Sequence, residues 1–229
     1  MNHQRTYILY LFLACSLLFL SLPAEAQFKR IKEQKEEMKD SLPLYRGVVV
    51  SYDLCSTVMR LVSDYGQFEA AAKVNLKDRY FPTLEIGYGT SNHETDPQTG
   101  LHTKTNAPFF RIGMDYNIAK QKHDDYRVFV GARYGFTTFS FEADGVITDP
   151  VWGGTTPYKI EQSGCSYHWA DLLFGLDAKV VDKLHVGWSL RYRLKLAEKG
   201  LENGELWYIP GFGKNGNKIA VSFNVGWEI

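Results

Sequence analysis

Residues 184–196, LHVGWSLRYRLKL, decide the fold of this chain. Large apolar or aromatic side chains occupy every even position from Leu184 to Leu196, and small, polar or charged side chains occupy every odd position from His185 to Lys195. Successive side chains of a β-strand point to opposite faces, so this period of two predicts a strand with one apolar and one charged face. Segments 109–118 and 218–229 repeat the pattern, which predicts an all-β protein.

Weaker alternation brings the number of predicted strands to eight. The five additional segments are 47–54, 67–76, 82–90, 126–141 and 165–180. Phe129 and Leu173 are exceptions that fall on the polar face. Near Phe139 and Phe141 the alternation shifts by one residue, and we expect a β-bulge there. Long links at 55–66, 91–107, 142–164 and 197–216 alternate with short links at 77–79, 120–125 and 181–183. An antiparallel sheet with all its long links at one end is therefore expected.

The first 26 residues have the features of a secretory signal peptide. Arg5 is followed by an apolar run from Tyr7 to Leu22 and by the small-residue site Ala24-Glu25-Ala26. A lipoprotein acylated at Cys15 is the alternative. The expected domains are a signal peptide at 1–26, a charged periplasmic segment at 27–43 and a barrel at 44–229. With 26 basic and 26 acidic residues, the chain lacks the basic surplus of a nucleic-acid binder.

Glycine indicates which face of the predicted barrel meets lipid. Alternation alone fits both a soluble lipocalin-like barrel, apolar inside, and a transmembrane barrel, apolar outside. The strand glycines share the charged face: Gly87, Gly89, Gly113, Gly131, Gly135, Gly175, Gly187 and Gly226. Small residues make room for charged side chains inside an eight-stranded barrel, whose lumen would be overfilled by roughly forty large apolar side chains. We therefore expect an eight-stranded antiparallel transmembrane β-barrel with a short N-terminal periplasmic segment.

Residues 44–229 resemble the small eight-stranded outer-membrane barrels of the OmpA/OmpX type. Segments beginning at Gly47 (GVVVSYDL), Phe81 (FPTLEIGYG) and Phe109 (FFRIGMDYN) are similar to those of an uncharacterised domain-of-unknown-function family of Gram-negative envelope barrels. The resemblance implies an integral outer-membrane location, periplasmic termini and extracellular long loops. Outer-membrane lipid and the barrel-assembly machinery are the implied partners. Such barrels often end in Phe or Trp, whereas this chain ends Trp227-Glu228-Ile229.

The alternation of strand faces predicts that fourteen charged side chains point into the lumen, seven cations and seven anions. The cations are Lys73, Arg111, Arg133, Lys179, Arg191, Arg193 and Lys195, and the anions are Asp53, Glu69, Glu85, Asp115, Asp171, Asp177 and Glu228. Charges in a low-dielectric interior must be paired. A salt-bridge network that closes the lumen is predicted, with a narrow aqueous path as the alternative.

No residue pattern predicts catalysis, a cofactor or a metal. His93, His102 and His168 lie in or beside long links, near Ser91, Asp96, Ser163 and Ser166, without the spacing of a nucleophile and its base. The chain is expected not to be an enzyme. A lipid-modifying enzyme of the lipid A acyl hydrolase kind and a soluble periplasmic lipocalin-like carrier are the alternatives.

Aromatic residues in the long links are the candidate contact sites. They are Trp152, Tyr158, Trp207, Tyr208 and Phe212. Exposed aromatic side chains of this kind bind an extracellular partner or a glycan, or else they pack together to close the barrel. The predicted role is structural or adhesive. The sequence leaves the pairing of Cys55 with Cys165 open.

Overall fold

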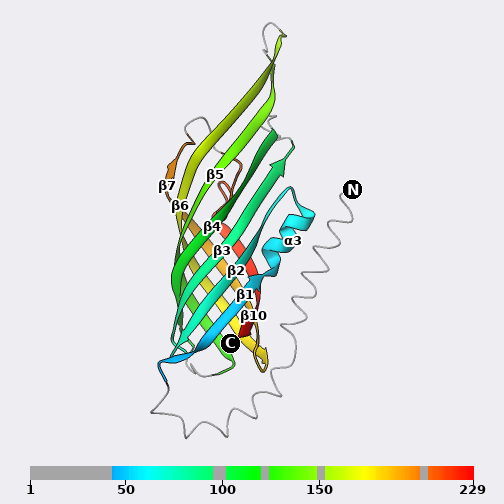
Figure 1. The fold of residues 1–229 in the computed structure, drawn as a ribbon. Coiled ribbons are helices and arrows are strands. Elements are labelled where there is room, and N and C mark those ends of the chain that lie inside the picture. The colour runs from blue at the N-terminus through cyan, green and yellow to red at the C-terminus, as the bar shows by residue number, and fades with distance from the viewer. Residues whose placement is uncertain (1–42, 95–101, 120–123, 149–152, 202–205) are drawn as a thin grey trace. The chain divides into compact units, whose positions relative to one another are not determined.

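Eight antiparallel strands close into a barrel in the computed structural model (Figure 1), which describes residues 43–94, 102–119, 124–148, 153–201 and 206–229. The strands are β1 (Tyr45–Asp53), β2 (Tyr65–Leu76), β3 (Tyr80–His93), β4 (His102–Asn117), β5 (Tyr126–Thr148), β6 (Thr155–Val181), β7 (Leu184–Lys199) and β10 (Ile219–Glu228). β1 closes the ring by pairing with β10, from Val49 opposite Glu228 to Asp53 opposite Asn224. The predicted all-β ring of eight antiparallel strands is confirmed. The predicted signal peptide, residues 27–42 and Trp152 lie outside the described residues.

Strand register places the charged positions of neighbouring strands on one face. Arg111 of β4 is paired with Glu85 of β3, and Arg133 of β5 is paired with Asp171 of β6. These four side chains are buried in the barrel interior. The alternate positions point outward, so that Ile112 is 62% exposed and Leu172 is 52% exposed. The ring therefore has a charged inside and an apolar outside.

Two strand glycines make room for aromatic rings that pack against the inner wall. A Cβ atom on Gly135 would lie 2.2 Å from the ring of Trp169, and one on Gly87 would lie 2.3 Å from the ring of Phe109. Real Cβ atoms do not approach other heavy atoms this closely. Phe109 and Trp169 are completely buried. The glycines therefore let large rings pack inside a narrow lumen.

The link after β1, predicted only as a long link at 55–66, contains a helix. Helix α3 (Leu54–Val62) begins at Asp53, whose side chain accepts from the Cys55 N–H at 3.0 Å. The same carboxylate accepts from the Phe223 N–H of β10 at 3.1 Å, just beyond the last β1–β10 pair. Asp53 thus caps the helix, and its carboxylate accepts a β10 hydrogen bond where the β1 backbone no longer pairs with β10.

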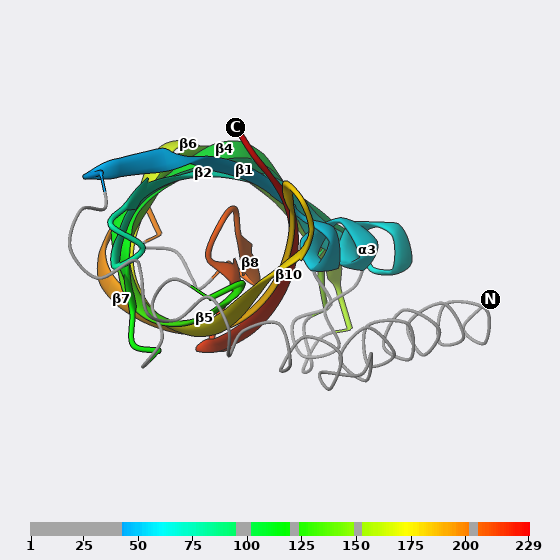
Figure 2. The same cartoon turned by 90° about the horizontal axis from the view of Figure 1, so that it is seen from below.

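Helix α3 lies outside the ring (Figure 2), with its backbone against β2. A Cβ atom on Gly66 would lie 2.4 Å from Cα of Arg60. The helix therefore covers the part of the wall that β1 does not reach. Among the described residues, no helix is long and apolar enough to cross a membrane. Cys55 in α3 and Cys165 in β6 are both free.

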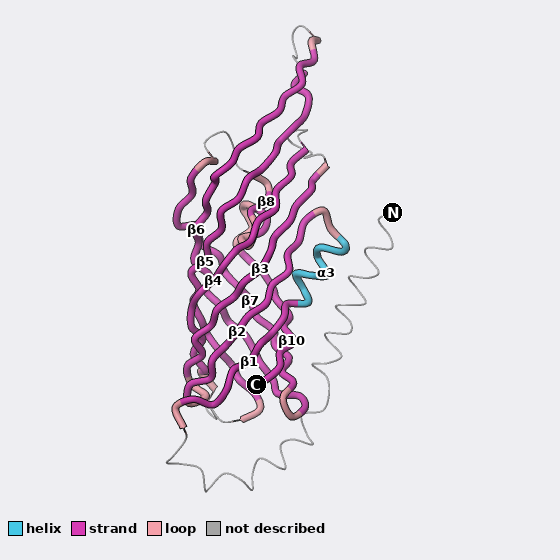
Figure 3. The backbone as a smooth tube through the Cα atoms, in the orientation of Figure 1, coloured by secondary structure: helices cyan, strands magenta, loops and turns pink. Residues whose placement is uncertain are grey.

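Two predicted long links are largely β-structure. β5 and β6 continue past the other strands as a hairpin (Figure 3), and their pairing persists to Thr148 opposite Thr155. The register shifts between Phe139 and Phe141, as the slip in parity predicted, and the pairing resumes beyond it. β4 likewise begins at His102 rather than after Ala107. The alternation in these ribbons is weak because polar side chains interrupt both faces, and this concealed them.

The last long link carries a small hairpin, formed by β8 (Tyr208–Ile209) and β9 (Gly213–Lys214). Figure 2 shows the segment with β8 inside the ring of strands. Tyr208 and Ile209 are buried. Of the two alternatives that the sequence left open for this link, the burial fits the one in which its aromatic residues pack together to close the barrel.

Gly135→Ala is expected to destabilise the barrel by about 1–3 kcal/mol, because the added methyl group must displace the buried Trp169 ring. Gly154→Ala is the matched control, since a Cβ atom there meets nothing within 4 Å. Equilibrium urea unfolding followed by tryptophan fluorescence measures both variants. Equal stability of the two variants would contradict the packing proposed for Gly135.

Candidate functional site

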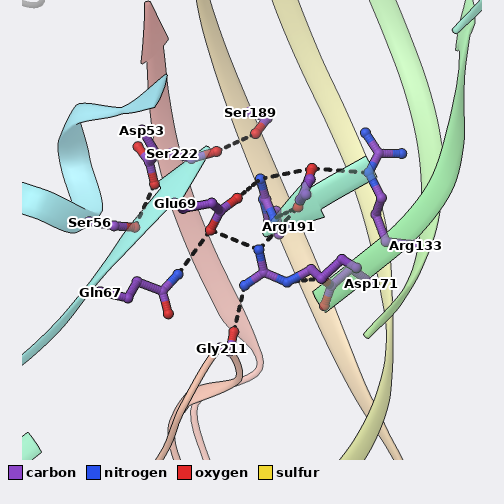
Figure 4. A network of polar contacts seen from close by, with 12 residues as sticks. Asp53, Ser56, Gln67, Glu69, Arg133, Asp171, Ser189, Arg191, Gly211 and Ser222 are labelled. Atoms are coloured by element: carbon purple, nitrogen blue, oxygen red, sulfur yellow. Dashed lines mark hydrogen bonds and ion pairs between the residues drawn. The ribbon is translucent and has the colours of Figure 1, made fainter. Parts of the chain in front are cut away.

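The centre of the lumen is an ion cluster built around Glu85. Its carboxylate is 2% exposed and contacts three guanidinium groups. Nη1 of Arg191 lies 2.8 Å from Oε2, Nη1 of Arg111 lies 3.0 Å from Oε2, and Nε of Arg133 lies 3.1 Å from Oε1. Glu69 joins two of the same arginines, with oxygens 2.7 Å from Arg111 and 2.8 Å from Arg191. Two carboxylates therefore hold three arginines in one connected group (Figure 4).

The cluster extends to both sides and is electrically balanced. Asp171 lies 3.3 Å from Nε of Arg111. Asp115 lies 2.7 Å from Nη2 of Arg133 and 3.1 Å from Nζ of Lys73. The eight members are Lys73, Arg111, Arg133, Arg191, Glu69, Glu85, Asp115 and Asp171. Four cations face four anions, and the residues come from six strands, β2 to β7. Such a network ties distant strands together and leaves no net charge to hydrate.

A second, smaller cluster lies toward the end of the barrel that carries the short turns. Lys179 Nζ contacts Glu228 at 2.7 Å, and the two nitrogens of His185 lie 2.9 Å from Asp177 and 3.5 Å from Glu228. Arg127 approaches Asp177 at 3.8 Å. Asp177, Lys179 and Glu228 were predicted members of the lumen set. The roles of His185 and Arg127 were missed, although His185 stands on the charged face of the 184–196 alternation.

Three of the fourteen predicted residues lie apart from both clusters. Asp53 caps α3 instead of pairing with a cation. Arg193 is buried and donates a hydrogen bond to the Ile219 carbonyl at 3.3 Å. Its guanidinium carbon lies 5.4 Å from the centre of the Phe212 ring. Within the described chain, no carboxylate lies within ion-pair distance of Arg193. Lys195 is 46% exposed and pairs with Glu198 at 2.7 Å. A register shift between β6 and β7 at Trp169 ends the strict alternation there, so Lys195 does not join the network.

The β8–β9 hairpin closes the lumen above the ion cluster. Arg111 Nη2 donates to the Gly211 carbonyl at 2.6 Å, which joins the cluster to the hairpin. The Phe212 ring packs edge-on against Tyr167 and Trp169, with centroids 5.0 and 6.1 Å apart. Tyr208 donates to the Gly66 carbonyl at 3.1 Å, and burial raises the pKa of this phenol, so it keeps its proton. An aromatic layer therefore lies directly on the ionic layer.

The structure corrects two of the candidate contact residues. Tyr208 and Phe212 are buried and cannot meet an external partner. Tyr158 is half-buried within β6 rather than in a loop. Trp207 is also half-buried, because its ring stacks on His93 with centroids 4.1 Å apart.

The histidines considered for catalysis are held by other groups. His102 contacts Asp144 and Asn92, each at 2.8 Å, and His168 Nδ1 lies 2.7 Å from the Tyr134 hydroxyl. His93 Nδ1 lies 3.6 Å from Asp64. In the described part of the chain, no serine forms a hydrogen bond with any of the three. Among the same residues, no group of three or more His, Cys, Asp or Glu side chains could hold a metal ion.

Glu85→Gln is expected to destabilise the protein by about 3–5 kcal/mol, because three buried arginines lose their shared counter-charge. Glu198→Gln is the control, since Glu198 pairs with an exposed lysine and its loss is expected to cost less than about 0.5 kcal/mol. Urea unfolding of both variants measures the difference. A near-neutral Glu85→Gln would show that the cluster contributes little to stability.

From the ion cluster and the aromatic layer of the β8–β9 hairpin above it, we predict that the purified barrel forms no stable ion-conducting pore. Planar-bilayer recordings are expected to stay at baseline, with a general porin as the positive control. The charged cluster and the aromatic hairpin occupy two successive levels of the lumen, so we expect no continuous water path between them. Large, reproducible conductance steps would restore the alternative of an aqueous path.

Comparisons with known proteins place the chain in a family. Among solved structures, the N-terminal β-barrel domain of Pseudomonas aeruginosa OprF matches with 12% identity and a TM-score of 0.33, over 81% of this chain and 99% of that one. No curated protein matches the chain. Residues 8–229 match the family described as a domain of unknown function, DUF6048. Because this match covers nearly the whole sequence, the protein belongs to the DUF6048 family.

Proposed function

We propose that the protein is an integral outer-membrane β-barrel with a closed lumen and a structural or surface-interaction role. The observation that carries the proposal is the inverted distribution of side chains in a closed ring. Charged residues are buried inside, and large apolar residues cover the outside. The half-exposed examples include Leu84, Ile86, Met114, Phe174, Leu190 and Val221. A soluble protein rarely exposes so continuous an apolar surface.

The height of the apolar surface suits the hydrocarbon core of an outer membrane. Outward-facing apolar side chains run from Pro108 in β4 to Ile118, one residue beyond the end of that strand. About ten residues, each rising ~3.3 Å along a strand tilted by ~40° from the barrel axis, give an apolar band ~25 Å high. Exposed Tyr80, Tyr126 and Trp227 lie near the short-turn end of this band, as interfacial aromatic residues do.

The closed lumen favours a structural or surface role over transport. A lipocalin-like carrier needs an apolar cavity, whereas the centre of this lumen holds eight acidic and basic side chains in contact with one another, covered by an aromatic plug. A lipid-modifying enzyme needs a nucleophile and base in contact, and the described histidines contact other partners. The polar β5–β6 hairpin and the other long links present surfaces for contact, because loops on a rigid scaffold carry recognition. We further propose that these links are extracellular and both termini periplasmic.

Membrane fractionation of cells that make the full chain tests the location. The protein is expected in the outer-membrane fraction, and its electrophoretic mobility is expected to change when the folded sample is boiled. The change reflects the resistance of a closed membrane barrel to detergent. Recovery in the soluble fraction would overturn the proposal.

Single cysteines test the orientation in a Cys55→Ser, Cys165→Ser background. Lys159→Cys lies on the β5–β6 hairpin, and Asp182→Cys lies in the short β6–β7 turn. Both positions are exposed. A membrane-impermeant maleimide applied to intact cells is expected to label Lys159→Cys alone, and both after lysis. Labelling of Asp182→Cys alone on intact cells would reverse the proposed orientation.

A further inference from the structure

The part of β6 in the projecting hairpin has a free strand edge. β6 pairs with β5 from Thr155 to Ala178, but its pairing with β7 begins only at Ser166. Among the described residues, β5 is the only strand whose backbone pairs with residues 155–165. Figure 3 shows this hairpin extending beyond the other strands. The backbone N–H and C=O groups on the far side of β6 are therefore available to another strand.

An exposed ion pair stands at the middle of this free edge. The side chains of Lys159 and Glu161 pair with each other, and each is 61% exposed. Ile160, between them, is half-buried and packs against the buried apolar cluster of the long links. The backbone on either side of the ion pair is held by β5 alone. The edge therefore presents one basic and one acidic residue, two positions apart, on its outer face.

A strand edge of this kind recognises an extended chain, because its row of backbone donors and acceptors matches that of a second strand. The order of the charges favours another copy of the same edge. When two copies pair antiparallel about Ile160, Lys159 of each copy stands opposite Glu161 of the other. Opposite charges directly across a sheet are favourable. The edge is thus complementary to itself in this one register.

The length of the free edge points to the same register. The unpaired stretch runs from Thr155 to Cys165, since β7 takes over at Ser166. Its midpoint is Ile160, which is also the midpoint of the ion pair. Two copies paired about Ile160 therefore oppose their free edges over the whole length, and each strand ends where β7 of the other copy begins.

Two further residues fit this register. Within its own chain, Glu161 is paired with Glu142 of β5, and like charges directly opposite each other are unfavourable. Lys159 of a second copy would place a cation on the other side of Glu161. Pro157 has no N–H to donate, but in this register it lies opposite Ser163, outside the central pairs.

We propose that two copies of this chain associate through their β6 edges, antiparallel and centred on Ile160. The two β5–β6 hairpins then form one continuous four-stranded sheet. Antiparallel pairing sends the two barrels in opposite directions from this sheet. In the membrane orientation proposed above, on which this consequence alone rests, the two copies belong to facing membranes. The surface role becomes a contact between two like surfaces.

Density-matched sedimentation equilibrium of the full chain in detergent tests the association. The wild-type protein is expected to show a monomer–dimer equilibrium. Lys159→Glu and Glu161→Lys are each expected to weaken the dimer about tenfold or more, because each variant places two pairs of like charges across the interface. Lys218→Glu is the matched control, since it reverses the charge of an exposed lysine outside β6, and it is expected to dimerise like wild type. A mobility change on boiling verifies that each variant is folded.

Mixing the two charge variants tests the complementarity itself. The edge of the Lys159→Glu chain is acidic and that of the Glu161→Lys chain is basic, so equal amounts are expected to form a heterodimer about as stable as the wild-type dimer. Fluorescence energy transfer between differently labelled chains measures it. Monomeric wild-type protein, an equal loss in Lys218→Glu, or no recovery on mixing would overturn the proposal.

Cysteine cross-linking tests the register in the Cys55→Ser, Cys165→Ser background. Ile160→Cys is expected to form a disulfide between two copies on mild oxidation, because directly opposite residues of antiparallel strands lie ~4.5–5.5 Å apart. Thr156→Cys is the control, since antiparallel pairing separates its two copies by about eight residues, or ~26 Å. Equal cross-linking of the two variants would contradict the register. None of these results decides the membrane location, which the fractionation experiment tests separately.

Discussion

The contact of Glu85 with three arginines is the constraint on which the rest of the barrel depends. A buried carboxylate or guanidinium is costly unless every charge in its group is paired. The central cluster meets this condition with four cations and four anions from six strands. A slip of one residue in any of these strands would turn its charged side chains outward and its apolar side chains inward. The ionic cluster and the apolar outer face therefore specify the same register.

The narrowness of the lumen explains the other features of the wall. Charged side chains, Phe109 and Trp169 fit inside only because glycines such as Gly87 and Gly135 leave space beside them. Where β1 stops, Asp53 and α3 take over, and the Asp53 carboxylate satisfies a β10 N–H that no strand residue pairs with. Closure of the ring is thus achieved by a side chain and a helix as well as by the strand ladder.

The two closing layers relate the fold to the proposed role. Ionic contacts fill the middle of the lumen, and the β8–β9 hairpin covers them with Phe212 and Tyr208. Arg111 belongs to both layers, since it pairs with glutamates and donates to Gly211. In the proposed role, a barrel closed in this way is a rigid support, and recognition falls to its outer surface and its long-loop end.

The strand pattern by itself determined the eight strands, the inward and outward faces, and the presence of most of the charged set in the lumen. These features are local, because the period of two is a property of the extended backbone. Tertiary structure alone decided which charges meet: Arg191 and Glu69 are 122 residues apart in sequence. It also removed Lys195 and Arg193 from the network, placed a helix after Asp53 and turned the β8–β9 hairpin inward. Those outcomes depend on how the ring closes and on how much space remains in the lumen. Both are properties of the assembled barrel and not of any single segment of the sequence.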